Sequence, residues 1–315
     1  MLPCGWLDKH LQRSGCLLKF EHDPVAIQVA FPTKSMELAT TSTYGELRLW
    51  QIPDGKLLKV FDRSPSLSVT LAPASTSIAV ASGSGVELWD TSNESLLHIL
   101  EGDTGYVNKA IFSPDGKNVA ATVYDFPNHK VQLWQVTDKK PMHTLLGHTS
   151  YVNDVAFTLD GKLLASASSD NTVRLWRVGD GTLLHTFEGH TESVESIDFT
   201  PEGTILASGA LDKTIRLWRV SDGALLHLLK GHTGHVRSLA FSPDGTILAS
   251  GGSDGTVRLW RVANGTLLRT VRQKLLFGGW VWSVAFSPDG TKLATALSRG
   301  PVRVFDVQQW ELNQP

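Results

Sequence analysis

The sequence has little cysteine, little net charge and no long hydrophobic run. It holds two cysteines in 315 residues, Cys4 and Cys16, too few for a disulfide framework, so reduced thiols and a cytoplasmic location are the simpler expectation, with a bridge between them left open. The net charge of −2 argues against strong attraction to nucleic acid or an anionic membrane. No stretch approaches the roughly 18 apolar residues of a membrane-crossing helix, and charges interrupt the start of the chain where a secretory leader would be apolar.

The chain has instead a repeated Leu-Trp pair or a close equivalent. Its aromatic member stands at Trp50, Trp89, Trp134, Trp176, Trp218, Trp260 and, in degenerate form, Phe305. The intervals are 39, 45, 42, 42, 42 and 45 residues. A period near 42 is typical of a unit that cannot bury its apolar face alone and stacks on its neighbours. Seven units account for nearly the whole chain, so we expect an N-terminal arm over 1–14 and one repeat domain over 15–315.

One repeat, residues 147–188, contains four short segments that favour strands. They are 151–157, 162–168, 172–178 and 182–187, in which apolar and β-branched residues alternate or form short runs. Asp-Gly and Gly-Asp pairs mark tight turns between them. Short, evenly spaced strands predict an all-β fold of antiparallel sheets. Four strands in each of seven units suggest seven blades around a central axis.

These features together resemble the tryptophan–aspartate (WD) repeat family of β-propellers over about residues 16–307. Three marks recur in register: a Gly-His before the first strand, an Asp between the second and third strands, and the Trp of the third strand. The resemblance implies a seven-bladed propeller in which a His, a Ser, an Asp and the Trp form a hydrogen-bonded tetrad. Carried over, the tetrads are His148, Ser166, Asp170 and Trp176 in blade 4; His190, Ser208, Asp212 and Trp218 in blade 5; and His232, Ser250, Asp254 and Trp260 in blade 6.

The chain departs from the family pattern in two respects. Asp follows the aromatic residue only at Asp90 and Asp306, whereas blades 4–6 have Arg there. Four blades also lack part of the tetrad. The residues at the affected positions are Tyr44 in blade 1, Gly83 in blade 2, Asp103 in blade 3 and Phe305 in blade 7. We expect apolar stacking to hold these blades more than tetrads do.

The last blade ends with its third strand, 302–307, and a matching fourth strand occurs at the other end of the chain. Gly15–Phe20 is similar to Gly181–Phe187, the fourth strand of blade 4. We therefore predict that the N-terminal strand pairs into the last blade and closes the ring, which hides edges that would otherwise template aggregation. The alternative, a strand formed by Trp310-Glu311-Leu312, is short and runs into the terminus.

Ser, His and Asp occur together in each tetrad, as they do in hydrolase triads. Three copies at one spacing, each with a Trp, are typical of a structural network, whereas a triad needs one exposed nucleophile beside an oxyanion site. Eleven histidines form no His-x-x-x-His motif, and there is no Cys-x-x-Cys pair. Ser82–Gly85 is glycine-rich but opens no helix, so it supports phosphate binding only weakly. We expect no metal, no cofactor and no enzyme activity.

The resemblance also implies a binding surface. In the family, partners contact the end of the ring called the top face, where the loops entering each blade and the turns between second and third strands gather. Carried over, the partner-binding residues are Tyr106, Asn108, Tyr124, Tyr151, Asn153, Glu195, Leu211, His235, Arg237, Trp280 and Trp282. Aromatic residues and Arg are enriched in interface hot spots. Alternatively, Phe277 and one of the two tryptophans fill the core of the degenerate blade 7.

Two insertions of three residues lengthen this face. They lie around Phe126–Lys130 in blade 3 and in the loop Arg272–Gly279 before blade 7.

We expect a non-catalytic scaffold, monomeric or a subunit of a hetero-complex, that binds a protein or peptide and neither nucleic acid nor membrane. Two alternatives are a sensor or regulatory module of a larger effector or signalling system, and an enzyme or small-ligand propeller that uses the central channel. The last would need Asp154, Glu195 and Asp198 to converge on the axis.

Overall fold

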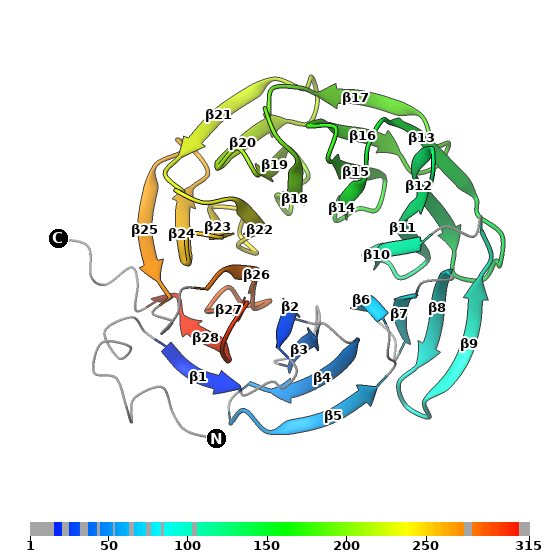
Figure 1. Ribbon diagram of the computed structural model, residues 1–315, viewed down its shortest axis with the longest axis horizontal. Coiled ribbons are helices and arrows are strands. Elements are labelled where there is room, and N and C mark those ends of the chain that lie inside the picture. Colours follow the sequence, from blue (N-terminus) through cyan, green and yellow to red (C-terminus); the bar gives the residue numbers. More distant parts are fainter. Residues whose placement is uncertain are drawn as a thin grey trace.

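The computed structural model describes residues 16–20, 25–31, 37–42, 45–52, 54–62, 66–73, 77–82, 85–102, 106–273 and 279–308. These residues form seven four-stranded antiparallel sheets arranged as the blades of a closed ring (Figure 1). The predicted seven-bladed propeller is therefore confirmed. The predicted arm over 1–14 lies outside the described residues, as do Tyr44, Gly83, Asp103, Phe277 and 310–312.

The strands follow one another around the ring in chain order. Blade 1 contains β2 (Ala26–Ala30), β3 (Glu37–Ser42), β4 (Glu46–Gln51) and β5 (Leu57–Asp62); blade 2 contains β6 (Ser66–Leu71), β7 (Ser77–Ser82), β8 (Gly85–Asp90) and β9 (Ser95–Leu100); blade 3 contains β10 (Tyr106–Phe112), β11 (Asn118–Asp125), β12 (Asn128–Gln135) and β13 (His143–His148). Blade 4 contains β14 (Val152–Phe157), β15 (Leu163–Ser168), β16 (Val173–Arg177) and β17 (Leu183–Phe187); blade 5 contains β18 (Val194–Phe199), β19 (Ile205–Ala210), β20 (Thr214–Arg219) and β21 (Leu225–Lys230). Blade 6 contains β22 (Val236–Phe241), β23 (Ile247–Gly252), β24 (Thr256–Arg261) and β25 (Leu267–Arg272); blade 7 contains β26 (Val281–Phe286), β27 (Lys292–Leu297), β28 (Val302–Asp306) and β1 (Cys16–Phe20).

The N-terminal strand closes the ring. β1 pairs antiparallel with β28, with Cys16 opposite Phe305 and Phe20 opposite Val302 (Figure 1). Phe20 is 1% exposed and its ring centroid lies 5.0 Å from that of Trp50 in blade 1. The predicted closure is thus confirmed, and the closing strand also supplies core side chains between the last blade and the first. Cys16 is disulfide-bonded, which corrects the expectation of reduced thiols, and the other half of that bridge lies outside the described residues.

The core lies between blades rather than within any one of them. Trp176 of blade 4 clusters with Leu133 of blade 3, and the Trp218 ring of blade 5 lies 5.5 Å from that of Phe187 in blade 4. A four-stranded sheet has two faces, and each is covered by the next sheet around the ring. This arrangement explains the near-continuous apolar character of the second strands, whose residues are buried on both sides.

The turns between first and second strands in blades 3 to 7 are fixed by the same three residue types. In blade 6, Ser242 Oγ and the Thr246 backbone N–H both donate to Asp244 Oδ1, at 2.5 and 3.0 Å. Gly245 has a φ of 70°, a left-handed conformation that residues other than glycine rarely adopt. The Ser/Thr-x-Asp/Glu-Gly pattern therefore encodes a tight turn that holds the first strand in register with the second.

The insertion in blade 3 lengthens a hairpin instead of forming a longer loop. β11 and β12 stay paired out to Asp125 and Asn128, so that only Phe126 and Pro127 form the turn. Phe126 is 91% exposed at its tip. The two strands can absorb the extra residues because strand pairing continues wherever the backbone stays extended. Asp125, at the tetrad position of blade 3, instead pairs with Lys130, whose Nζ lies 3.0 Å from Asp125 Oδ2.

Candidate binding face

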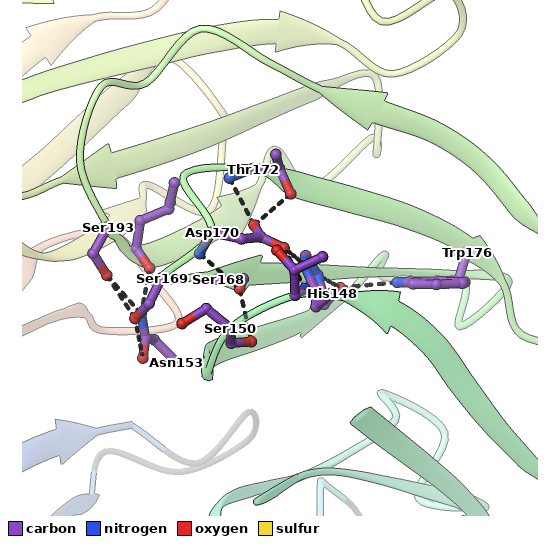
Figure 2. A network of polar contacts seen from close by, with 12 residues as sticks. His148, Ser150, Asn153, Ser168, Ser169, Asp170, Thr172, Trp176 and Ser193 are labelled. Atoms are coloured by element: carbon purple, nitrogen blue, oxygen red, sulfur yellow. Dashed lines mark hydrogen bonds and ion pairs between the residues drawn. The ribbon is translucent and has the colours of Figure 1, made fainter. Parts of the chain in front are cut away.

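A buried hydrogen-bonded tetrad fixes the entry to blade 4. His148 ends β13, Asp170 follows β15 and Trp176 lies on β16 (Figure 2). Ser166 lies on β15. Trp176 Nε1 lies 2.9 Å from Ser166 Oγ, which lies 2.8 Å from His148 Nε2. His148 Nδ1 lies 2.8 Å from Asp170 Oδ2. The tetrad thereby joins the loop entering the blade to its second and third strands.

The proton positions in this tetrad follow from its chemistry. The indole N–H of Trp176 can only donate, so Ser166 Oγ accepts from it and gives its own proton to His148 Nε2. His148 Nδ1–H then donates to Asp170, a tautomer assigned from the network. Burial alone would raise the pKa of the Asp170 carboxyl, but hydrogen bonds from His148, Thr172 and a backbone N–H hold that pKa well below its usual range.

The same geometry recurs in blades 5 and 6. The His–Asp, His–Ser and Trp–Ser distances are 2.8, 2.8 and 2.8 Å for His190, Asp212, Ser208 and Trp218, and 2.9, 2.8 and 2.9 Å for His232, Asp254, Ser250 and Trp260. The three serines are 0% exposed. A hydroxyl that is buried and already bonded on both sides has no access to a substrate carbonyl, so these groups act as structural links and not as triads.

In the degenerate blades, the indole N–H groups of the tryptophans donate to other acceptors. Trp50 Nε1 donates to Thr40 Oγ1 at 2.9 Å, Trp89 Nε1 to Glu87 Oε2 at 2.9 Å, and Trp134 Nε1 to the Glu101 carbonyl at 2.8 Å. In blade 7, Phe305 is 0% exposed and has no polar atom to satisfy. Each of these three indole N–H groups thus still finds an acceptor among the described residues, as buried donors must.

None of the residues assigned from the sequence to the top face is buried, and most belong to three connected groups. Tyr106, Tyr151 and Trp280 are 45%, 51% and 44% exposed. Asn108, Tyr124, Asn153, Glu195, Leu211, His235, Arg237 and Trp282 are half-buried. Their role in partner binding stays a prediction, and the groups are described in turn.

The first group is a tyrosine cluster at the junction of blades 3 and 4. The rings of Tyr106 and Tyr124 stack at 5.8 Å with 13° between their planes, and the Tyr151 ring meets Tyr124 edge-on at 4.8 Å. His129 of β12 packs against Tyr151 at 4.8 Å. Burial raises the pKa of Tyr124 to about 12, and the nearby charge of Glu195 adds to this effect. We call Tyr106, Tyr124 and Tyr151 the tyrosine cluster.

The second group is a polar chain that connects blades 4 and 5. Asn153 Nδ2 donates to Ser169 Oγ, Ser193 Oγ and the Val194 carbonyl, each at 2.9 Å (Figure 2). Ser193 Oγ donates to Glu195 Oε1 at 2.9 Å. These contacts cross from one blade to the next, so they fix how neighbouring parts of the face sit relative to one another.

The third group joins blades 5, 6 and 7 through Arg237. Its Nη1 donates to Glu195 Oε2 at 2.8 Å and its Nε to Ser253 Oγ at 3.1 Å. Its Cζ lies 5.5 Å from the Trp280 ring centroid and 5.4 Å from that of Trp282. The two indoles meet edge-on at 5.3 Å. We call Trp280 and Trp282 the tryptophan pair; both lie at the surface of blade 7, against the alternative that one of them fills its core.

A ring of contacts between the innermost strands escaped the sequence analysis. Four side chains each accept a hydrogen bond from a backbone N–H in the first strand of the next blade, at 2.9 to 3.2 Å. The acceptor and donor residues are Asp154 and Ile197, Ser196 and Leu239, Ser238 and Val284, and Ser283 and Val29. All four acceptors occupy the same position of their repeats. The recurrence of serine at this position could have indicated a shared role. A repeat pattern does not, however, show which backbone N–H of the next blade the hydroxyl binds.

Of the acidic residues considered for a channel site, Asp154 belongs to this ring and Asp198 makes another contact between blades. Asp154 is 4% exposed and pairs with Lys109. Asp198 accepts the backbone N–H groups of Phe199 and Phe241 at 2.9 and 2.8 Å. Burial raises the pKa of Asp198 to about 7. Glu195 faces Arg237 instead and is not part of that pair. Because the carboxylate oxygens already bind backbone donors across blades, they serve as links between blades.

Comparison with known proteins places the repeats in a family. A family model described as "WD domain, G-beta repeat" matches residues 139–177, 181–219, 223–261 and 265–306, half of the chain. Each matched segment starts just before the fourth strand of one blade and ends in the third strand of the next, and the first three contain the three tetrads. No curated protein matches the chain. The described part of the chain has no helix with the length and apolar character needed to cross a bilayer.

Proposed function

The chain belongs to the WD-repeat family of β-propellers, and on that premise we propose that it is a non-catalytic scaffold that presents its top face to a protein or peptide. Propellers of this family commonly serve as protein-interaction scaffolds. The tyrosine cluster, the polar chain and the tryptophan pair together span blades 3 to 7 on that face. This continuous, partly exposed arc is the observation that carries the proposal.

The arc has the composition and the rigidity of a binding surface. Large exposed aromatics are unusual on a surface without a partner, and Tyr, Trp and Arg are the residues most enriched in hot spots. Hydrogen bonds between Asn153 and Ser193, and between Arg237 and Glu195, hold the side chains in place before a partner arrives. A surface that is already ordered loses less side-chain entropy on binding, which favours recognition by this face.

The alternative of a small-molecule site in the central channel has less support. The raised pKa of Asp198 is the kind of perturbation that marks functional carboxylates. Both of its oxygens, however, accept backbone N–H groups, one of them from the neighbouring blade. Such bonding supports a role in joining blades, so we favour the scaffold.

The test compares partner capture by two charge-changing variants with that by a matched control. Trp282→Glu and Arg237→Glu alter the arc, whereas Arg219→Glu alters an exposed arginine that pairs only within its own blade. Proteins recovered with the unaltered chain are quantified for each variant by mass spectrometry. We expect the two top-face variants to lose at least one specific partner that Arg219→Glu retains. If both variants fold, judged by thermal unfolding, and retain every partner, the proposal is wrong.

A further inference from the structure

The top face carries two aromatic groups, and the chain's own cation occupies one of them. The guanidinium of Arg237 lies over both indoles of the tryptophan pair, 5.5 and 5.4 Å from their centroids. These distances are within the range of cation–π attraction. The same arginine also bonds Glu195 and Ser253, so it is held in this position from two sides.

The tyrosine cluster is the counterpart without such a cation. Tyr106 and Tyr151 expose about half of their surface, 45% and 51%. Among the described residues, the Lys and Arg side chains that lie over aromatic rings are those of Lys59, Arg216 and Arg237, and none lies over this cluster. The nearby lysines of blade 3 are engaged elsewhere, Lys109 with Asp154 and Lys130 with Asp125.

The electrostatic surroundings of the cluster favour positive charge. The faces of the three phenol rings are negative because of their π electrons. Glu195 also acts on Tyr124, but its carboxylate is paired with Arg237, so the rings supply the main attraction. An anionic side chain would be repelled by the rings. A neutral apolar side chain would gain only burial, whereas a cation would gain burial of its stem and attraction to the rings.

We propose that the tyrosine cluster binds an arginine or lysine side chain of the partner, which would occupy it much as Arg237 occupies the tryptophan pair. This inference rests on the proposed function, because it names the chemistry that a protein or peptide must bring to the top face. It also divides the arc into two subsites. The tryptophan pair offers apolar surface around a charge that is already neutralised, and the tyrosine cluster selects a cation.

The experiment uses the small number of tyrosines. The chain has four, and three of them form the cluster, so uniform labelling with 3-fluorotyrosine yields few ¹⁹F NMR signals, assigned by single Tyr→Phe variants. The full labelled chain is titrated with blocked pentapeptides Gly-Ser-X-Ser-Gly, where X is arginine, lysine, citrulline, leucine or glutamate. We expect the arginine and lysine peptides to shift the cluster signals and saturate. Citrulline, the uncharged analogue of arginine, should bind about 3- to 30-fold more weakly, the range that cation–π attraction provides.

Two substitutions of Tyr151 test whether its aromatic ring, and not its hydroxyl group, carries the preference for a cation. Tyr151→Phe keeps the aromatic face and should retain the preference for arginine over citrulline, whereas Tyr151→Leu removes the face and should abolish it. His227→Leu, on the outer strand β21 of blade 5 and away from the top face, is the control and should leave that preference unchanged. Thermal unfolding checks that each variant folds. The inference is overturned if the citrulline or the glutamate peptide binds as tightly as the arginine peptide. It is also overturned if no peptide shifts the cluster signals.

Failure of this inference differs from failure of the proposed function. If Trp282→Glu and Arg237→Glu lose partners while the cluster signals ignore cationic peptides, the scaffold stands and the cation preference is wrong. If those variants keep every partner, the top face is not the binding surface, whatever the peptides do.

Discussion

Arg237 of blade 6 and Glu195 of blade 5 form an ion pair across the boundary between the two blades, with Nη1 2.8 Å from Oε2. Their side chains are 18% and 21% exposed, so solvent screens the pair less than it would screen a fully exposed one. The same arginine contacts both members of the tryptophan pair. One side chain thus connects three blades, and its position on the top face depends on all of them.

A double-mutant cycle should measure this coupling. Arg237→Ala, Glu195→Ala and the double variant are compared by urea unfolding, and we expect an interaction free energy of about 1 kcal/mol. Arg219 and Asp222 form a pair at the same distance of 2.8 Å, but both side chains are about half exposed. A cycle on that control pair should give a clearly smaller coupling. Equal couplings would mean that partial burial does not strengthen the pair.

Loss of the tetrad hydroxyl in blade 5 should be costly. Ser208→Ala leaves the Trp218 indole N–H without its acceptor and His190 Nε2 without its donor in a buried site. We expect a loss of about 1–3 kcal/mol in the free energy of unfolding, the usual penalty for stranded buried polar groups. Ser221→Ala, an exposed serine of the same blade, serves as the control and should change stability little. A neutral Ser208→Ala would show that water replaces the hydroxyl.

The tetrad aspartates should make the fold sensitive to acid. Burial opposes ionisation of Asp212, but hydrogen bonds from His190 and Thr214 outweigh it and lower its pKa below the ordinary value of 3.8. The ionised carboxylate therefore stabilises the fold above about pH 4, and this contribution is lost as the pH falls further. Asp212→Asn should cost on the order of 2 kcal/mol at pH 7. The difference from the unaltered chain should shrink in urea unfolding at pH 3, and a constant difference would contradict the assignment.

Asp198 should produce the opposite dependence. Burial raises its pKa to about 7, so the folded chain retains a proton that the unfolded chain releases above about pH 4. Stability should therefore fall as the pH rises from about 4 to about 7, by on the order of 4 kcal/mol, since one pKa unit corresponds to about 1.36 kcal/mol. Ala240 and Ala285 occupy the equivalent position in blades 6 and 7, so Asp198→Ala is a natural variant to compare. Its unfolding free energy should lose this decline, and an unchanged pH profile would place the titration elsewhere.

The repeat itself made most of the fold predictable. The spacing of the tryptophans determines the number of blades, and the Asp-Gly turns determine where strands end. The similarity of Gly15–Phe20 to an internal fourth strand was enough to predict that β1 pairs with β28. These features are local or recur at one period, so a single sequence contains them several times over.

Contacts between blades were not predictable in the same way. The bond from the Ile197 backbone N–H to Asp154 joins residues 43 positions apart, and its existence depends on the angle at which two sheets pack. The stacking of Tyr106 on Tyr124 depends likewise on how far the β10–β11 ladder extends toward the top face. Residue type indicated that these positions matter, but their neighbours follow only from the assembled ring.

The pairing of β1 with β28 also bears on how the protein is made. Of the strands in the ring, β1 is translated before its partner β28 and before all the strands between them, so it stays unpaired until those blades have been made. A chain that stops early would leave an apolar strand, with Phe20 at its end, lacking the neighbour that covers it. Such a fragment exposes a ready template for self-association.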